Sequence, residues 1–300
     1  MNYQTTLVTA YYFVSSSSTP KHEYVSRGER TLRIHQPMII FCEQETKDHI
    51  LKIRSQFNLQ HITYIITLPY QHLLFYHYRN RIEQNREIYW PTRDPRAPTD
   101  VHVICVSKFD FIQRALLLNP FQTPYMAWID FSLLGKTMNN SQNYINDDIY
   151  DKINTICQNP RHKFTIQILQ CWSPNDYQDL HQFYSSYAWI VAGCFFTMDI
   201  QTGLLITSKL IDKVIDITKK GYGHGEEAFF SYIIDEYLEH FNLNVGDYQD
   251  IIHNYYKITS NHHYVQWVLQ RCKERNLQPK LKKIIDTITE FDKDSIFKEY

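Results

Sequence analysis

Short apolar runs and a helical pattern alternate along the first part of the chain. Residues 37–41 (PMIIF) and 61–68 (HITYIITL) are apolar and rich in β-branched side chains, which is typical of buried strands. Between them, residues 43–57 carry apolar side chains three and four positions apart behind an acidic start, which predicts an amphipathic helix. A strand, a helix and a second strand in this order predict a parallel sheet with a crossover helix.

The same two patterns continue along the rest of the chain. Further strands are predicted over residues 7–14, 125–130, 164–170 and 189–197, and further helices over residues 106–118, 147–157, 203–220 and 225–241. Residues 70–98 are aromatic, basic and proline-rich without a sustained period, so we expect a long loop there, with or without one short helix. The pattern predicts one α/β domain over residues 1–260, and two lysine-rich helices in an extension (residues 261–300) packed on it.

Composition and charge narrow the class of protein. The chain has 300 residues, of which 43% are hydrophobic, and it contains 23 Tyr, 17 Phe and only 8 Gly, which excludes collagen-like, low-complexity and wholly disordered chains. Its 31 Lys and Arg nearly balance its 32 Asp and Glu, so we expect no nucleic-acid partner, because nucleic-acid-binding proteins usually carry a basic surface. No apolar run approaches the roughly 20 residues that span a bilayer, and no signal peptide is apparent. A cytoplasmic protein is therefore expected.

The cysteines give no sign of a metal or a disulfide framework. The six residues, Cys42, Cys105, Cys157, Cys171, Cys194 and Cys272, lie far apart in the sequence and form no CxxC pair. We interpret them as reduced core residues.

Asp130 is the sharpest candidate for chemistry. It ends the apolar run 125–130 (YMAWID), at the carboxyl edge of a parallel sheet, where α/β proteins bind their ligands. Because an unpaired buried carboxylate is costly, Asp130 must meet a cation, N–H donors or water. A divalent metal ion carrying a diphosphate is one such cation, since hard cations prefer carboxylate and phosphate oxygens. A loop cap through Ser132 and backbone amides is the alternative.

Three other places in the sequence are notable for the residue preferences of helix starts and strands, which two of them depart from and one follows. Lys108 is expected in the first turn of helix 106–118, where the helix dipole disfavours a cation, so either an anion such as phosphate lies nearby or the side chain is solvated. Gly193 interrupts an apolar strand, which indicates either close approach of a ligand or a β-bulge. Glu226 and Glu227 begin a helix, where the dipole favours carboxylates and where one of them is also placed to act as a base.

Several segments, taken in order, resemble the HtrL/YibB family (also called WlaTC) of glycosyltransferase-like proteins, which have a GT-A-type fold. The resemblance runs over roughly residues 5–260. One departure is that the DxD motif of GT-A enzymes reads Asp130-Phe131-Ser132 and has lost its second aspartate. The matching segments are TLVTAYY (6–12), PMIIF (37–41), SKF (107–109), NPF…YMAWIDF (119–131), AGCFFT (192–197), GEEAFFSYII (225–234) and GDYQDIIHNYY (246–256).

The resemblance implies a GT-A-like, Rossmann-type α/β domain with a mixed, mostly parallel sheet. It also implies a UDP- or GDP-sugar donor, whose base stacks on Tyr11 or Tyr12. Asp130 and His253 are expected to hold Mn²⁺ or Mg²⁺, with His262 and His263 competing for the histidine's role. Glu227, or alternatively Glu226, is expected to take a proton from the acceptor hydroxyl in an inverting transfer, or to position the donor sugar in a retaining one. The residues expected to bind the nucleotide-sugar are Thr9, Ala10, Tyr11, Lys108, Asp130, Gly193 and His224.

The sequence thus predicts a metal-assisted glycosyltransferase that transfers a hexose or pentose to a hydroxyl group of a glycan or protein. The missing second aspartate favours an alternative, a catalytically inactive module of the same fold that binds a sugar-nucleotide or glycan. A nucleic-acid enzyme built on the aromatic and basic loop 70–96 is the third interpretation. The neutral net charge argues against it.

Overall fold

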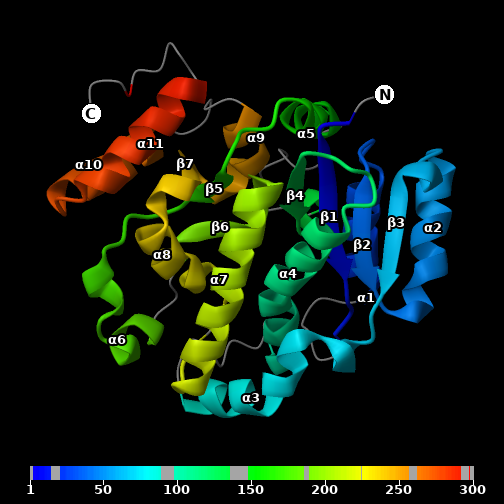
Figure 1. Cartoon of the computed structure of the whole chain (residues 1–300), viewed down its shortest axis with the longest axis horizontal. Helices are drawn as coiled ribbons and strands as arrows, with labels where there is room; N and C mark the ends of the chain where they lie inside the picture. Colours follow the sequence, from blue (N-terminus) through cyan, green and yellow to red (C-terminus); the bar gives the residue numbers. More distant parts are fainter. Residues whose placement is uncertain are drawn as a thin grey trace.

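The computed structural model describes residues 3–14, 21–88, 98–135, 148–185, 189–223, 225–256, 262–291 and 297. Among them is a central seven-stranded sheet in the order β3-β2-β1-β4-β6-β5-β7 (Figure 1). The strands are β1 (Thr5–Tyr11), β2 (Met38–Cys42), β3 (Thr63–Thr67), β4 (Tyr125–Ile129), β5 (Phe164–Ile168), β6 (Val191–Asp199) and β7 (Phe241–Val245).

The sheet is mixed but mostly parallel, which confirms the predicted sheet type. β3, β2, β1 and β4 run parallel to one another, with Leu7 opposite Met38 on one side and opposite Ala127 on the other. β6 is antiparallel to both of its neighbours, β4 and β5, and β7 is again parallel to β5. Since the carboxyl ends of parallel strands meet at one edge, β1 and β4 deliver the residues that follow them to the same place.

Among the described residues, no helix combines the length and the apolar character that crossing a membrane requires.

Helices cover both faces of the sheet. The helices are α1 (Lys21–Leu32), α2 (Lys47–Gln56), α3 (Arg79–Ile88), α4 (Thr99–Leu118), α5 (Asp148–Gln158), α6 (Leu180–Tyr184), α7 (Ile200–Lys219), α8 (Glu227–Glu236), α9 (Ile251–Tyr256), α10 (His262–Glu274) and α11 (Gln278–Phe291).

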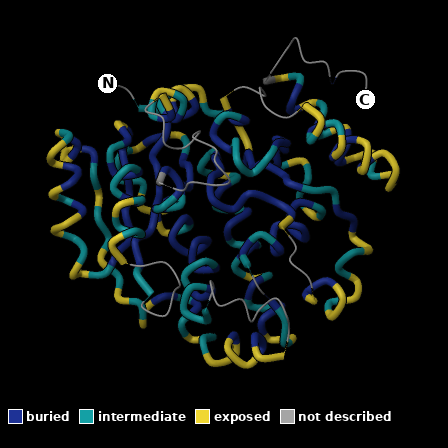
Figure 2. Tube along the Cα trace, turned by 180° about the vertical axis from the view of Figure 1, so that it is seen from behind, coloured by how far each residue is buried: buried dark blue, intermediate teal, exposed yellow. Residues whose placement is uncertain are grey.

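The alternation of side chains along the strands builds two cores. In β1, Val8 and Ala10 pack in the core formed with α4, α7 and α8, whereas Leu7 and Tyr11 pack in the core formed with α1, α5 and α9. In Figure 2 the buried residues follow the central strands, and the exposed ones gather on the outer helices.

Most predicted elements are present, with three informative differences. Helix α1 was missed altogether. Helix α4 begins at Thr99, not near residue 106, and ends at Leu118, where Asn119 caps it with a left-handed backbone (φ 31°). Its added first turns contain β-branched residues that disfavour a helix, but His102 and Val103 are buried there, and this tertiary packing outweighs the propensity.

The third difference is at the sheet edge. The helix predicted over residues 225–241 ends at Glu236 as α8, and the chain then forms β7 from the sequence FNLNV. The pattern changes from the helical period to strict alternation within a few residues, so the sequence shows no clear boundary between the two elements. The loop 70–98 holds the short helix α3, as one of the two expectations had it.

The two C-terminal helices were predicted correctly, and they share the main core. Val268 and Leu269 of α10 and Ile284 of α11 are fully buried in the cluster that contains the strands. Figure 1 shows α11 beside β7 and α10 next to α11, and the Leu243 N–H of β7 donates a 3.1 Å hydrogen bond to Thr287 Oγ1 of α11.

Arg54 of α2 is a buried cation that joins α2 to its surroundings. It is fully buried, and burial lowers its pKa to about 10, so it stays charged at neutral pH. Its partners are one hydroxyl and backbone carbonyls from two segments, the end of α1 with the residues before β2, and the residue before β3. The guanidinium therefore holds these segments against α2. The bonds run from Arg54 to Leu32 O (3.1 Å), Ile34 O (2.8 Å), Gln36 O (3.0 Å), Ile62 O (3.3 Å) and Thr63 Oγ1 (2.7 Å).

We predict that Arg54→Met lowers the free energy of unfolding by at least about 3 kcal/mol, because several buried carbonyls lose their donor at once. Lys52→Met is the matched control on the same helix, since Lys52 is exposed, and it should change stability by less than about 0.5 kcal/mol. Urea unfolding of the two variants and the wild type makes the comparison. Equal effects of the two substitutions would contradict this role of Arg54.

Candidate functional site

A cavity of about 280 Å³ lies where β1 and β4 end. From β1, the chain continues to β2 and β3 on one side, while β4 lies on the other side, so the cavity is at a point where the strand order reverses. Open α/β sheets bind ligands at such points. The lining residues come from the end of β1 and the segment after it (Ala10, Tyr12, Phe13, Val14), from α1 (Tyr24, Arg27), from α4 (Val101, Ile104, Cys105, Lys108, Phe111) and from the end of β4 (Trp128, Asp130, Phe131, Ser132).

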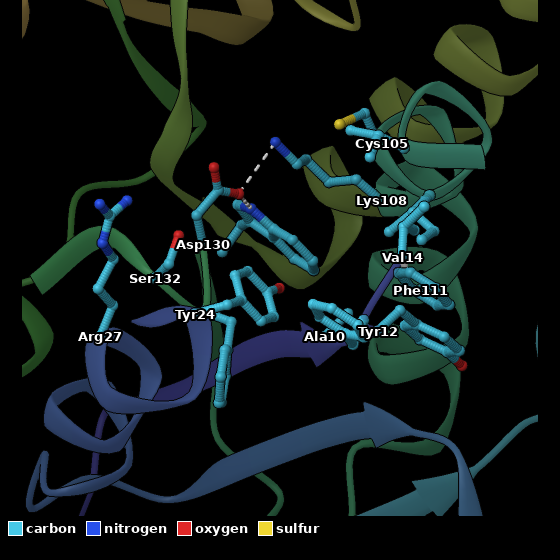
Figure 3. A pocket seen from close by; sticks show the side chains of 15 residues that line it. Ala10, Tyr12, Val14, Tyr24, Arg27, Cys105, Lys108, Phe111, Asp130 and Ser132 are labelled. Atoms are coloured by element: carbon cyan, nitrogen blue, oxygen red, sulfur yellow. Dashed lines mark hydrogen bonds and ion pairs between the residues drawn. The ribbon is translucent and has the colours of Figure 1, made fainter. Parts of the chain in front are cut away.

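Asp130 lies at the rim of this cavity, at the strand end where it was expected. Its Oδ1 accepts a 2.7 Å hydrogen bond from Trp128 Nε1 and lies 3.1 Å from Lys108 Nζ, as Figure 3 shows. Its side chain is 29% exposed, whereas that of Lys108 is only 3% exposed. The cation that this carboxylate needs is therefore supplied within the chain by Lys108.

Lys108 contacts three oxygen-bearing groups that come from different elements. Its ammonium donates to the Gly193 carbonyl oxygen (2.7 Å) and to Glu226 Oε1 (2.5 Å), and it forms the ion pair with Asp130. These three partners match the three N–H groups of an ammonium. Burial alone would lower the pKa of Lys108, but the carboxylates of Asp130 and Glu226 raise it well above its ordinary value, so the side chain stays charged.

The expectation that Lys108 lies in the first turn of its helix was wrong. α4 begins at Thr99, which places Lys108 in the middle of the helix, away from the unfavourable end of the dipole. The anions that account for this buried cation are Asp130 and Glu226. A role of Lys108 toward a phosphate stays a prediction.

Gly193 allows this cluster to form. A Cβ at this position would lie 2.9 Å from Glu226 Oε1, closer than real Cβ atoms approach a neighbour. The pairing of β5 with β6 also shifts here, from Ile166 opposite Phe196 to Ile168 opposite Val191, so β6 carries extra residues around Gly193. The irregularity agrees with the β-bulge interpretation of Gly193. The groups that approach Gly193 are Lys108 and Glu226 of the chain itself, and close approach of a ligand stays a prediction.

Glu226 and Glu227 are adjacent in sequence but differ in environment. Glu226 is buried, 6% exposed, and bound to Lys108. Glu227, the first residue of α8, is half-buried, and burial together with the charge of Glu226 raises its pKa to about 8. Glu227 therefore holds a proton near neutral pH, which suits a group that exchanges protons.

The other predicted donor-binding residues take different positions. Ala10 and Tyr12 line the cavity. Tyr11 points to the opposite core, where it is 2% exposed and stacks on Phe131 with ring centroids 4.5 Å apart. Thr9 is fully buried. His224 lies outside the described residues.

The described residues do not form a complete metal site on their own. They contain no group of three or more His, Cys, Asp or Glu side chains placed to hold a metal ion. Asp130 is the one carboxylate among the described residues that line the cavity, and its Oδ1 already meets Trp128 and Lys108. His253 lies on α9, where its Nε2 is 3.3 Å from Lys152 Nζ. Metal binding by Asp130 and His253 stays a prediction.

Several lining residues, among them Tyr24, Arg27 and Trp128, were not singled out in the sequence. Tyr24 and Arg27 come from α1, and Figure 3 shows them on the Asp130 side of the cavity. Trp128 lies in the run that ends at Asp130, and it fixes that carboxylate. Glu23 and Arg27, which form an ion pair, lie four residues apart, and this spacing is a sequence signal for helix α1.

Comparison with known proteins places the chain in a family. A family model described as "Bacterial protein of unknown function (HtrL_YibB)" matches residues 3–258. The chain belongs to the HtrL_YibB family. No curated protein matches the sequence.

Two solved structures are distantly similar to this HtrL_YibB chain. Mouse xyloside xylosyltransferase 1 in its apo form is 12% identical, with a TM-score of 0.42 over 87% of this chain and 96% of the other. The 4-diphosphocytidyl-2C-methyl-D-erythritol synthase of Anaerococcus prevotii is 11% identical, with a TM-score of 0.38 over 87% of this chain and 93% of the other.

We predict that Gly193→Ala destabilises the protein by about 1–3 kcal/mol, because the new methyl group displaces Glu226 from Lys108. A double-mutant cycle with Glu226→Ala tests this cause, since removing the Glu226 side chain also removes the clash. The double variant should lose clearly less stability than the sum of the two single variants in urea unfolding. Strictly additive losses would show that Gly193 does not act through Glu226.

The raised pKa of Glu227 predicts a pH dependence of stability. The unfolded chain releases this proton near the ordinary value of 4.5, and the folded protein keeps it until about 8. The stabilisation is therefore complete below the unfolded value and is lost as pH rises through the folded one. Glu227→Gln should lose less stability than the wild type between about pH 5 and about pH 9, measured by urea unfolding. Parallel pH profiles would contradict the raised pKa.

Proposed function

We propose that this HtrL_YibB protein is a nucleotide-sugar glycosyltransferase, which moves a sugar from a UDP- or GDP-sugar to a hydroxyl group of a glycan or protein. The observation that carries the proposal is Asp130, a carboxylate held by Trp128 and Lys108 at the rim of a cavity where the strand order reverses. The resemblance of segments such as YMAWIDF to glycosyltransferase-like proteins supports the same function.

The cavity has the chemistry that a nucleotide needs. Tyr12, Tyr24 and Trp128 give it aromatic walls, against which a base can stack. Arg27 adds a guanidinium on the Asp130 side, and guanidinium groups suit phosphate oxygens because of their planar set of donors. We assign the base to the aromatic walls and the diphosphate to the space between Arg27 and Asp130.

A divalent ion fits this arrangement only when the substrate supplies some of its ligands. Asp130 would hold Mn²⁺ or Mg²⁺ together with phosphate oxygens of the donor, since such ions are often bound by one or two carboxylates plus a phosphate. When bound, the ion would offset negative charge on the departing diphosphate.

A residue of the chain can accept the proton that the acceptor hydroxyl loses during the transfer. In an inverting transfer, the acceptor oxygen forms a bond to the anomeric carbon, the bond to the diphosphate oxygen breaks, and the acceptor hydroxyl loses its proton. We assign that proton to the ionised form of Glu227, because Glu226 is engaged by Lys108, so the transfer should become faster as pH rises through about 8. Lys108 keeps Glu226 and Asp130 in place and so positions both ends of the site.

We predict that UDP- or GDP-sugars raise the Tm of the full-length protein, and that one of them is turned over. Asp130→Asn should lower donor affinity or turnover by about 10²-fold or more, because it removes the carboxylate charge that would hold the divalent ion against the diphosphate. Asp212→Asn, at an exposed position on α7, is the matched control and should behave as the wild type. Thermal shifts with a panel of UDP- and GDP-sugars, each with Mn²⁺ and with a chelator, together with release of UDP or GDP, provide the measurements.

The outcomes separate the proposals. Stabilisation by a sugar-nucleotide without release of UDP or GDP would favour the inactive binding module. Full activity of Asp130→Asn, or no response to any donor, would contradict the proposed function.

A further inference from the structure

Two of the six cysteines, far apart in sequence, meet where the C-terminal helices join the sheet. Cys171 lies just after β5, and Cys272 lies in the last turn of α10. Their side chains share a hydrogen bond, so the two thiols are in contact. The sequence interpretation of the six cysteines, as reduced core residues far apart in the chain, did not predict this contact.

The backbone around the pair is held on both sides. Arg275, next to α10, donates 3.3 Å to the Cys171 carbonyl oxygen and 3.0 Å to Ser173 Oγ, and it also pairs with Asp176. Lys280 of α11 donates 2.8 Å to the carbonyl oxygen of Trp172. These contacts keep the segment after β5 against α10 and α11, so the two sulfur atoms stay together.

The surroundings give the two thiols different roles. The hydrogen bond from Cys272 lowers the pKa of Cys171 against the effect of burial, and the cations Arg275 and Lys280 lower it further, while Asp176 opposes them. The same hydrogen bond and burial raise the pKa of Cys272. Cys171 is half-buried and Cys272 is buried, so a small oxidant reaches Cys171 first.

Other cysteines lack these conditions. Burial raises the pKa of Cys157 to about 12, and burial also raises that of Cys42. Cys105 is half-buried like Cys171, but burial and the charge of Glu226 raise its pKa well above the ordinary value. Cys105 is thus a matched comparison for Cys171, with similar exposure and the opposite electrostatics.

We propose that Cys171 and Cys272 are a peroxide-sensitive pair, in which Cys171 is the attacking thiol and Cys272 closes a reversible disulfide. The Cys171 thiolate attacks one oxygen of hydrogen peroxide, so that an S–O bond forms, the O–O bond breaks, and hydroxide leaves and takes up a proton. Cys272 then attacks the Cys171 sulfur, the S–O bond breaks, and the leaving hydroxide takes the proton of Cys272 to form the second water. Both sulfurs are oxidised, and one peroxide is reduced to two waters.

The disulfide would connect the segment after β5 to α10 across about 100 residues of sequence. A cross-link over such a distance restricts the unfolded chain, so the oxidised protein should have a higher Tm than the reduced protein. The proposal does not depend on the proposed glycosyltransferase activity.

The test uses the reduced full-length protein, treated with hydrogen peroxide, alkylated, and measured by intact mass and peptide mapping. We expect a mass loss of two hydrogens, a Cys171–Cys272 cross-linked peptide, reversal by dithiothreitol, and a higher Tm before reversal. Cys171 should react at least about tenfold faster than Cys105, since the thiolate fraction sets the rate.

Variants in the same protein separate the roles of the thiols. Cys272→Ser should stop the reaction at a Cys171 sulfenic acid, which dimedone traps, and Cys105→Ser should still form the disulfide. A dimedone adduct on Cys105 in place of Cys171, cross-links between molecules, or peroxide treatment that leaves both thiols free to alkylate would each overturn the proposal. Melting curves of the reduced variants establish that they are folded.

Discussion

The buried ammonium of Lys108 is the constraint on which the site depends. A charge in the interior is tolerated only when every donor finds a partner, and Lys108 finds its partners on the ends of β4 and α8 and on β6. Those elements must therefore meet at one point. The rim of the cavity, the orientation of Asp130 and the approach of α8 to Gly193 all follow from this contact.

The charges around Lys108 also explain the difference between the two glutamates. One ammonium faces two carboxylates, Asp130 and Glu226, so a third ionised group nearby has no cation left to offset it within this cluster. Glu227 is that third group, and burial together with the charge of Glu226 raises its pKa. A carboxyl group with a pKa of about 8 can exchange a proton near neutral pH.

Helix α8 is fastened by a lysine at each end. Lys108 binds Glu226 at its beginning, and Lys280 of α11 pairs with Asp235 near its end, where both side chains are nearly buried. Tyr177 also donates 2.8 Å to Asp235, and Trp172 Nε1 donates 3.2 Å to the Ser231 carbonyl oxygen in the middle of the helix. The C-terminal helices thus help to hold the helix that carries Glu227, and the Cys171–Cys272 pair lies in the same contact region.

The sequence by itself determined many of the local elements, although it missed α1 and β7. The β-α-β start, the two C-terminal helices and the position of Asp130 at the end of β4 could all be predicted, because periodicity and strand termination depend on neighbouring residues. Only the tertiary structure decided that Lys108 pairs with Glu226, that Arg27 and Tyr24 reach the cavity, that FNLNV is a strand and that Cys171 meets Cys272. These contacts join residues that are distant in the chain, and the pattern at either position contains no information about its partner. The environment in the fold also decided the roles of two adjacent glutamates. Glu226 is the ion-pair partner of Lys108, whereas Glu227 has a raised pKa and holds a proton.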